Sequence, residues 1–393
     1  MKNAVLAALA SMALAASSAN AVDFTVASCD ELAEVDDTTV TSLTITASPF
    51  ECAEYTRLRV RNTMTLDATV SEVVFSNFSL KVLRDLTVEA NVEFTGVTDQ
   101  VKNGGVLYVA EGATATFMGT SSFTDNSVME KTLEPISCGT SCSRTNYVIK
   151  KGGAIHNKGN LVFEGDATFE RNEARVADDE DYNVGKGGSI SNAAPGVITF
   201  KGKLTIEDGQ AEGVFVGQGG AVYNRGDIVV GGEAFFSGNR AGYGAAIYQT
   251  RWGTLTFNGM TTFSENYSEL NGGGITNIGG VVNFNAGSLF DDNGVYFSDG
   301  ESGSGGAIYN YDGGVITHTG STTFSNNYAW YGGAVLNQVE EPTSWDDDEG
   351  DYSTPTITFP DDVVFEGNSA EYCPDVSYAE FAAGREDDAC WSL

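Results

Sequence analysis

The chain has 393 residues, of which 41% are hydrophobic and 11% aromatic, so it can bury a core and is not intrinsically disordered. Its 54 acidic and 21 basic residues give a formal net charge of −33, which argues against nucleic acid or an anionic membrane as partner because both repel an acidic surface. Glycine is abundant (47 residues) and proline scarce (7), which excludes collagen and proline-rich linkers and indicates many tight backbone corners.

Residues 1–21 have the pattern of a secretory signal peptide. Lys2 precedes an apolar run from Ala4 to Ala16, and Ala19-Asn20-Ala21 provides an A-x-A cleavage site. This run of roughly 13 residues is shorter than the about 20 that a membrane span needs, and no later segment reaches that length. We therefore expect cleavage after Ala21, no membrane span, and a secreted protein that is extracellular or associated with the cell surface.

Six cysteines follow the leader, and an even number in an exported chain indicates disulfides. Pairing by proximity along the chain predicts the bonds Cys29–Cys52, Cys138–Cys142 and Cys373–Cys390. The first and last pairs would staple the two ends of the fold, in an N-terminal cap within 22–103 and a C-terminal disulfide cap at 371–393. With only His156 and His318 as further soft ligands, the chain predicts neither a zinc site nor another metal, and no cofactor.

Two short motifs alternate through residues 104–370. The first is Gly-Gly-small-aliphatic-x-Asn, and its copies begin at Gly152, Gly187, Gly219, Gly272, Gly305 and Gly332, with weaker copies at Gly104 and Gly244. The second is Phe-x-x-Asn, and its copies begin at Phe123, Phe169, Phe236, Phe263, Phe290, Phe324 and Phe365. The seven intervals between Gly104 and Gly332 average about 33 residues, a period that indicates a repeat architecture.

Each unit also contains a third strand-like segment between the motifs. In the unit that starts at Gly305 the three segments are 307–309, 315–317 and 322–324. Three short strands separated by Gly- or Asn-rich turns fit one coil of a parallel β-helix, whereas a helical repeat would need a 3.6-residue apolar stripe and a propeller blade a fourth strand. We predict an all-β fold: a right-handed, single-stranded parallel β-helix (solenoid) with three short strands per coil and about ten coils, the first of them before Gly104 at Leu43-Thr44-Ile45 and Leu58-Arg59-Val60.

The motif positions have physical roles on this model. The Ile or Val in fourth place should point inward, and the Asn two residues later should form a ladder of amides along the axis. The Gly pair supplies backbone angles that a Cβ would forbid. The Phe of the second motif should be a core rung, and its Asn should lie past the strand end in the left-handed region.

The two motifs resemble the repeats of the chlamydial polymorphic outer-membrane proteins, from about Gly104 to Asn368. The resemblance implies a right-handed β-helix passenger that acts in adhesion at a cell surface. The sequence departs from that family in ending at Leu393 without a run of membrane strands, so we expect a free-standing protein without the autotransporter barrel.

Two functions are consistent with such a β-helix. One is a structural or adhesive surface protein whose elongated face binds extracellular glycans or surface proteins. The alternative is an extracellular polysaccharide-active enzyme: a lyase, hydrolase or epimerase. Because Lys150-Lys151 and Arg171–Arg175 are isolated in the sequence and no acid–base set converges, the sequence predicts no catalytic residues and favours adhesion.

The fifth place of the Gly-Gly motif alternates away from the core, so it should face outward. It holds tyrosine at Tyr108, Tyr223, Tyr248 and Tyr309, which would form a partial aromatic ladder for sugar rings or a partner surface. The favoured alternative is that these tyrosines stack on one another or lie beneath loops.

The remaining features are loops and sequons. Asp178–Asp181 and Trp345–Asp351 are acidic insertions, interpreted as solvated loops in preference to Ca²⁺ sites. Asn77-Phe78-Ser79 and Asn266-Tyr267-Ser268 are glycosylation sequons if the source is eukaryotic.

Overall fold

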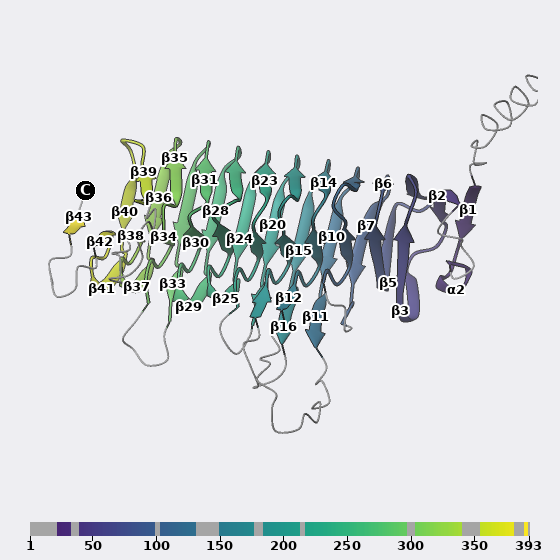
Figure 1. Cartoon of the computed structure of the whole chain (residues 1–393), viewed down its shortest axis with the longest axis horizontal. Helices are drawn as coiled ribbons and strands as arrows, with labels where there is room; N and C mark the ends of the chain where they lie inside the picture. The colour runs from purple at the N-terminus through teal and green to yellow at the C-terminus, as the bar shows by residue number, and fades with distance from the viewer. Residues whose placement is uncertain are drawn as a thin grey trace, which may run out of the picture.

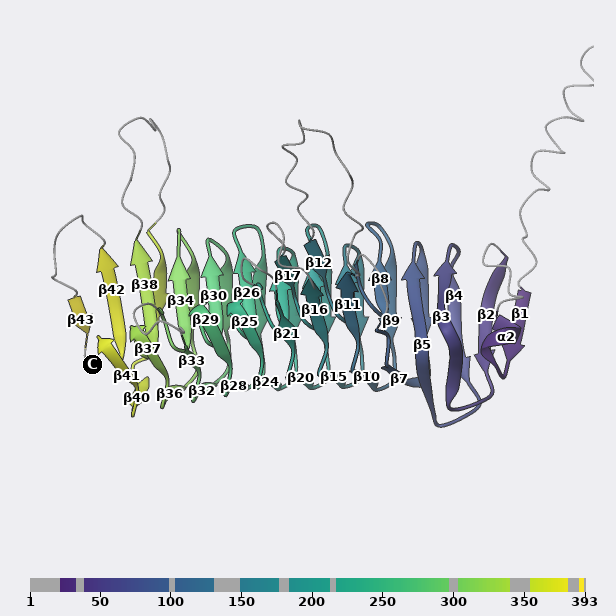
Figure 2. The ribbon, with the colours of Figure 1, turned by 90° about the horizontal axis from the view of Figure 1, so that it is seen from below.

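Parallel strands stacked coil upon coil form almost the whole molecule (Figure 1). The structure is a computed structural model, and it describes residues 22–32, 39–98, 103–130, 149–176, 184–212, 217–296, 303–339, 354–380 and 389–391. In these ranges the regular elements are strands and one short helix, α2 (Cys29–Leu32). The fold is a parallel β-solenoid with β1 at one end and β43 at the other, as Figures 1 and 2 show.

One face of the solenoid is a twelve-stranded parallel sheet, here called sheet A. In spatial order its strands are β1 (Val22–Val26), β2 (Val40–Ile45), β4 (Met64–Ala68), β6 (Asp85–Val88), β9 (Thr114–Phe117), β14 (Asn160–Phe163), β19 (Val197–Phe200), β23 (Asp227–Val230), β27 (Thr254–Phe257), β31 (Val281–Phe284), β35 (Val315–His318) and β39 (Thr356–Thr358). At about 4.8 Å per strand the axis is roughly 53 Å long, close to the length expected for ten coils.

The two sequence motifs form two further stacks, joined into one sheet because β3 (Phe50–Val60) and β5 (Glu72–Val82) run through both. The Gly-Gly stack continues with β8 (Leu107–Val109), β13 (Ile155–Asn157), β18 (Ile190–Asn192), β22 (Val222–Asn224), β26 (Ile247–Thr250), β30 (Ile275–Ile278), β34 (Ile308–Tyr311), β38 (Val335–Val339) and β42 (Val376–Glu380). The Phe stack continues with β7 (Asn91–Thr95), β10 (Ser121–Thr124), β15 (Ala167–Glu170), β20 (Leu204–Glu207), β24 (Ala234–Ser237), β28 (Thr261–Ser264), β32 (Ser288–Asp291), β36 (Thr322–Ser325) and β40 (Val364–Glu366).

A fourth strand in each later coil forms an eight-stranded sheet, here called sheet C, which the sequence did not predict. Its strands are β11 (Ser127–Glu130), β16 (Glu173–Val176), β21 (Gln210–Ala211), β25 (Arg240–Tyr243), β29 (Tyr267–Asn271), β33 (Gly294–Val295), β37 (Tyr328–Tyr331) and β41 (Ser369–Tyr372), and the pair β12 (Ile149–Lys151) and β17 (Val184–Lys186) lies beside it. The prediction of three strands per coil is therefore wrong for these coils. In β5 the Phe segment and the Gly-Gly segment form one continuous strand. In later coils a strand of sheet C lies between them. These inserted strands are as short as two residues and have no repeated composition, so the sequence did not reveal them.

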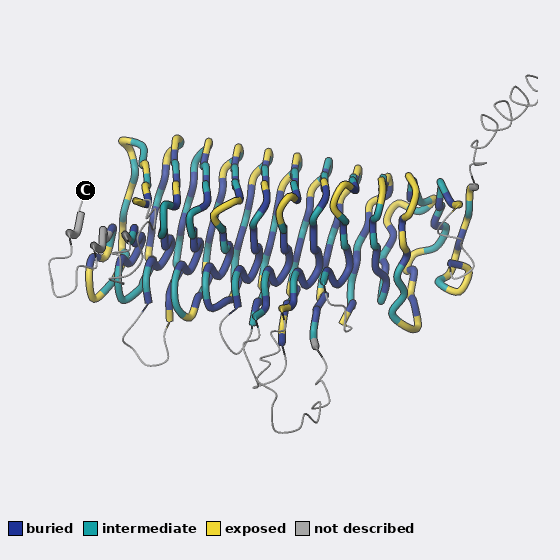
Figure 3. Tube along the Cα trace, in the orientation of Figure 1, coloured by how far each residue is buried: buried dark blue, intermediate teal, exposed yellow. Residues whose placement is uncertain are grey.

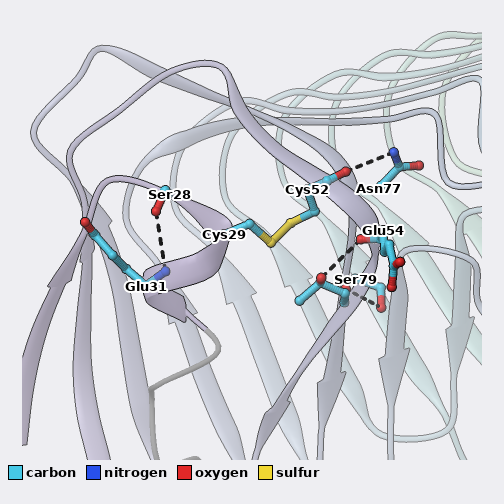
Figure 4. The surroundings of a disulfide bond; sticks show 8 residues. Ser28, Cys29, Glu31, Cys52, Glu54, Asn77 and Ser79 are labelled. Carbon is cyan, nitrogen blue, oxygen red and sulfur yellow. Dashed lines mark hydrogen bonds between the residues drawn. A yellow bond between two sulfur atoms is a disulfide. The ribbon is translucent and has the colours of Figure 1, made fainter.

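The ends carry the disulfides. The predicted Cys29–Cys52 bond is confirmed and links α2 to β3, with Cα atoms 5.2 Å apart. Figure 4 shows this bond and the Asn77 amide that donates to the Cys52 carbonyl oxygen at 3.1 Å. Cys373 is also disulfide-bonded. The strand with its predicted partner Cys390, β43 (Ala389–Trp391), pairs antiparallel with β42, while Cys138 and Cys142 lie outside the described residues.

The core is a set of columns of like side chains. Figure 3 colours the buried positions of the chain dark blue. Leu43 and Val60 are already buried, so the solenoid begins before Gly104 as expected. Phe263, Phe290, Phe324 and Phe365 stack with centroid spacings of 4.8, 4.8 and 5.0 Å and interplanar angles of 10° or less. His318 replaces Phe in the sheet A column and stacks on Phe284 at 4.5 Å, and burial lowers its pKa to about 3, so it is neutral like its neighbours.

Phe290→Ala and Phe324→Ala should each reduce the free energy of unfolding by about 3–5 kcal/mol. Both rings are fully buried, and each lies between two others in a narrow column that cannot close around a cavity. Urea unfolding followed by circular dichroism measures this change. A loss below about 1 kcal/mol for both variants would show that the Phe column does not support the fold.

The Asn of the Gly-Gly motif forms the predicted ladder. Asn157 donates to Asn192, Asn192 to Asn224, and Asn224 to Gln249, at 2.9, 2.9 and 2.8 Å, and a second run joins Asn277, Asn310 and Asn337. The first Gly of the pair has positive φ, 65° at Gly152. The second has no room for a side chain, since a Cβ on Gly153 would lie 2.2 Å from the carbonyl oxygen of Gly188 on the next coil.

The Asn of Phe-x-x-Asn forms a second ladder that the sequence did not predict. Asn239, Asn266, Asn293, Asn327 and Asn368 are joined amide to amide at 2.8 to 3.0 Å, and each also donates to the carbonyl of a Phe-stack residue one coil back. The prediction that this Asn is left-handed is wrong. The residue before it is left-handed, with φ of 51° to 56° at non-glycine positions such as Asp125 and Asp292, and this turn directs the Asn side chain inward.

Asn293→Ala should reduce the free energy of unfolding by about 3 kcal/mol, because it leaves the buried amides of Asn266 and Asn327 each without a ladder partner. Asn285→Ala is the matched control, since Asn285 forms an exposed amide pair with Asn258 and should lose under about 0.5 kcal/mol. Thermal unfolding of both variants tests this difference. Equal losses would contradict a structural role for the ladder.

Candidate functional site

The outer side of the Gly-Gly stack carries the tyrosines singled out in the sequence. In the register of the sheet, Tyr108, His156, Ser191, Tyr223, Tyr248, Thr276, Tyr309 and Leu336 form one column along the axis. They point away from the core, as the alternation predicts. Sheet C runs along the same side of the solenoid in Figures 1 and 2.

The expectation of an aromatic ladder open to a ligand is wrong for Tyr223 and Tyr309, and it stays a prediction for Tyr108 and Tyr248. Tyr223 and Tyr309 are only 6% and 7% exposed, and Tyr108 and Tyr248 are half-buried. Tyr223 stacks on Tyr248 at 5.6 Å and 8°, and Tyr243 of sheet C packs edge-on against Tyr248 at 6.4 Å. Burial raises the pKa of Tyr248, with Tyr223 and Tyr243 contributing. The alternative interpretation, tyrosines that stack on one another, therefore holds for this pair.

The same side gathers cations that the sequence had left apart. Lys151 and Lys186 are paired on neighbouring coils next to the Gly-Gly corner, and Lys158 and Arg225 follow the motif Asn on the other side of the column. We call Lys151, Lys158, Lys186 and Arg225 the basic cluster. Ser191 and Ala193, both small, lie on the coil between His156 and Tyr223. The cluster and the small residues thus come from three successive coils.

Neighbouring positive charges contribute to the lowered pKa values of Lys151 and Lys186. Burial and, after it, the positive charges of Lys151 and Arg225 together lower the pKa of Lys186 to about 8. The pKa of Lys151 is lowered for the same reasons, by burial and then by Lys158 and Arg225. Burial lowers the pKa of His156 to about 3, with Lys151 and Lys158 adding to the effect, so its imidazole is neutral. Lys186 also lies over the Tyr223 ring, 4.7 Å from the centroid.

Polar atoms in the middle of the cluster lack partners. The hydroxyl oxygen of Ser191 is buried without a hydrogen bond, and the buried ring nitrogens of His156 have no partner besides a backbone hydrogen bond with Ser191. Sequence reasoning missed this assembly because its members come from three coils. A usable signal was present in Lys-Gly-Gly, which occurs at both 151–153 and 186–188.

A second assembly lies along sheet C. Tyr267, Tyr296, Tyr328, Trp330 and Tyr372, here called the aromatic patch, come from four successive coils. Tyr296 is 73% exposed and Tyr372 45% exposed. Tyr267 and Tyr328 lie 6.2 Å apart between centroids, and Trp330 lies 6.3 Å from Tyr372. Desolvation and the nearby carboxylates of Asp292 and Glu265 raise the pKa of Tyr267.

The remaining predicted sites have different outcomes. Asn266 is fully buried within the second ladder, so glycosylation at this sequon is incompatible with the fold, whereas Asn77 is partly exposed. Within the described ranges no group of three His, Cys, Asp or Glu side chains could hold a metal ion. The acidic insertions Asp178–Asp181 and Trp345–Asp351 lie outside those ranges.

Comparison with known proteins supports the resemblance seen in the motifs. The Chlamydia polymorphic membrane protein repeat matches residues 321–338, which contain Phe324-Ser325-Asn326-Asn327 and the Gly-Gly motif at Gly332. This segment is one passage from the Phe stack through sheet C to the Gly-Gly stack, β36, β37 and most of β38. No curated protein and no solved structure matches the chain. The repeat and the solenoid together indicate a β-helix protein of the surface type, and no helix among the described residues is long and apolar enough to cross a membrane.

Lys186 should titrate near pH 8 instead of near 10.5, because burial and two neighbouring cations disfavour its charged form. NMR of ¹³C-dimethylated lysines measures this, and Lys186→Arg assigns the resonance. Lys151→Gln should move the Lys186 midpoint upward, since it removes one of the repelling charges. A midpoint above pH 10 in the wild type would contradict the clustering of these cations.

Proposed function

We propose that this protein is a secreted, extracellular or cell-surface β-helix protein that adheres to glycans through the aromatic patch of sheet C. The observation that carries the proposal is a row of exposed and half-exposed aromatic rings on four successive coils, from Tyr267 on β29 to Tyr372 on β41. At the spacing of parallel strands this row is roughly 14 Å long. Such a length suits contact with several units of a chain-like ligand.

The chemistry of the patch favours sugars. Flat aromatic faces pack against the apolar faces of pyranose rings, and tyrosine and tryptophan add hydrogen bonds from their edges. The carboxylates of Asp292 and Glu265 lie close enough to Tyr267 to change its pKa, so acceptors for sugar hydroxyls stand beside the rings. Exposed aromatic side chains on a rigid strand framework also lose little conformational entropy on binding.

The location is part of the proposal. A leader with the A-x-A site at Ala19-Asn20-Ala21 and a disulfide between Cys29 and Cys52 are features of exported proteins. The repeat that matches residues 321–338 belongs to membrane proteins of Chlamydia and supports a surface role. The ladder tyrosines Tyr223 and Tyr309 do not take part, because both are buried.

A glycan array with the wild type and a Tyr296→Ala/Tyr372→Ala variant tests the proposal. Loss of two stacking rings should weaken binding of an array hit at least about tenfold, which corresponds to about 1.4 kcal/mol. Met118→Ala is the control, since Met118 is 49% exposed on the turn between β9 and β10. Unchanged binding in the double variant would rule out the aromatic patch.

The same experiment distinguishes the adhesive function from the alternative, a polysaccharide-active enzyme. After incubation each hit is analysed for chain length and for unsaturated ends. An intact glycan is expected for an adhesive protein. Shortened or unsaturated products from the wild type would instead establish a polysaccharide-active enzyme.

A further inference from the structure

Among the residues that the structure describes, the four residues of the basic cluster have no acidic partner. Other cations do: Lys201 pairs with Glu164 at 2.7 Å and Arg175 with Glu212 at 3.1 Å. In the part of the chain that the structure describes, no carboxylate lies within ion-pair distance of any member of the cluster. Within the described ranges, four neighbouring cations without a carboxylate leave a place for an anion from outside.

The centre of the cluster has hydrogen-bonding capacity that the fold does not use. His156 and Ser191 are fully buried and lie side by side in the column, and the Ser191 hydroxyl oxygen has no hydrogen-bond partner among the described residues. A neutral imidazole and a hydroxyl can both donate a hydrogen bond to an oxyanion. In the free protein, buried polar atoms without partners lower the free energy of unfolding. Like charges at Lys151 and Lys186 on adjacent coils add to that cost.

An exposed indole extends the cluster. Trp252 is 69% exposed, and the Arg225 guanidinium lies 5.1 Å from its ring centroid. A small free anion would use the cations alone, whereas a charged sugar would use the cations and the ring together. We propose that the basic cluster binds the sulfate or carboxylate groups of an acidic saccharide, with Trp252 stacked on a sugar ring of the same chain.

This inference goes beyond the proposed function, since it concerns another part of the surface and another ligand chemistry. The net charge of −33 repels an acidic saccharide at long range, and physiological salt reduces this repulsion. Charges farther away than a Debye length of about 8 Å are largely screened, so the cluster dominates the field that a bound anion experiences. Binding should also raise the pKa of Lys186, which faces Lys151, Arg225 and the Tyr223 hydroxyl.

Calorimetric titration of the full-length chain with a heparin-derived hexasaccharide, its desulfated and carboxyl-reduced counterpart, and inorganic sulfate tests the proposal. The sulfated hexasaccharide should bind, and the neutral counterpart should bind at least tenfold more weakly. Lys151→Gln/Lys186→Gln should weaken binding at least tenfold and should leave the fold intact, because it removes a repulsion. Lys201→Gln/Lys203→Gln removes the same charge from the turn between β19 and β20 and should have no effect.

The outcomes separate the parts of the proposal. Equal losses in the two double-lysine variants would overturn it, since net charge and not a site would then govern binding. Sulfate that binds as tightly as the hexasaccharide, with no loss in Trp252→Ala, would overturn the assignment to a saccharide. Tyr296→Ala/Tyr372→Ala should bind the hexasaccharide like the wild type, so failure of the aromatic patch and failure of the basic cluster are distinguishable.

Discussion

Register between coils is the constraint on which the rest of this structure depends. Parallel strands repeat at about 4.8 Å, so a side chain that points into the solenoid must stack on its counterpart in the next coil. Aromatic rings meet this condition, and Phe263, Phe290 and Phe324 stack at 4.8 Å. Amides meet it as well, because at this spacing the Asn293 amide donates to the Asn327 oxygen at 3.0 Å. The two Asn ladders therefore fix the register between coils and also satisfy the hydrogen bonds of buried amides.

The same register acts on the outer surface, where nothing selects for identical neighbours. It places Lys151 beside Lys186, whose pKa is lowered by burial and then by the Lys151 charge. It also places Tyr223 beside Tyr248, and their rings stack. Inside the solenoid, repeated side chains pack against or hydrogen-bond to their counterparts in the next coil. Outside, repetition either stabilises, as for rings, or destabilises, as for like charges. The basic cluster is thus a local departure from the rule that keeps the interior uniform, and such departures are where function is expected.

The strands of sheet C differ in sequence from coil to coil. Its strands follow the second Asn ladder and vary from Glu173-Ala174-Arg175-Val176 to Tyr328-Ala329-Trp330-Tyr331. The core columns do not pass through its outer face, so those positions are free to carry charges in one half of the solenoid and aromatic rings in the other. A rigid interior with a variable outer side suits a protein that presents different surfaces along one axis.

The sequence by itself determined the solenoid, the Phe column, the first Asn ladder and the Cys29–Cys52 bond, because each depends on a residue type that recurs at a fixed place in the repeat or on a short separation along the chain. It did not reveal the second ladder, because the left-handed turn at residues such as Asp125 decides where the following Asn points, and many residue types adopt that turn. It also did not reveal sheet C, whose short strands have no common pattern. The burial of Tyr223 and the meeting of Lys151, Lys186 and Arg225 were decided only by the tertiary structure, because they depend on which residues from separate coils occupy neighbouring positions.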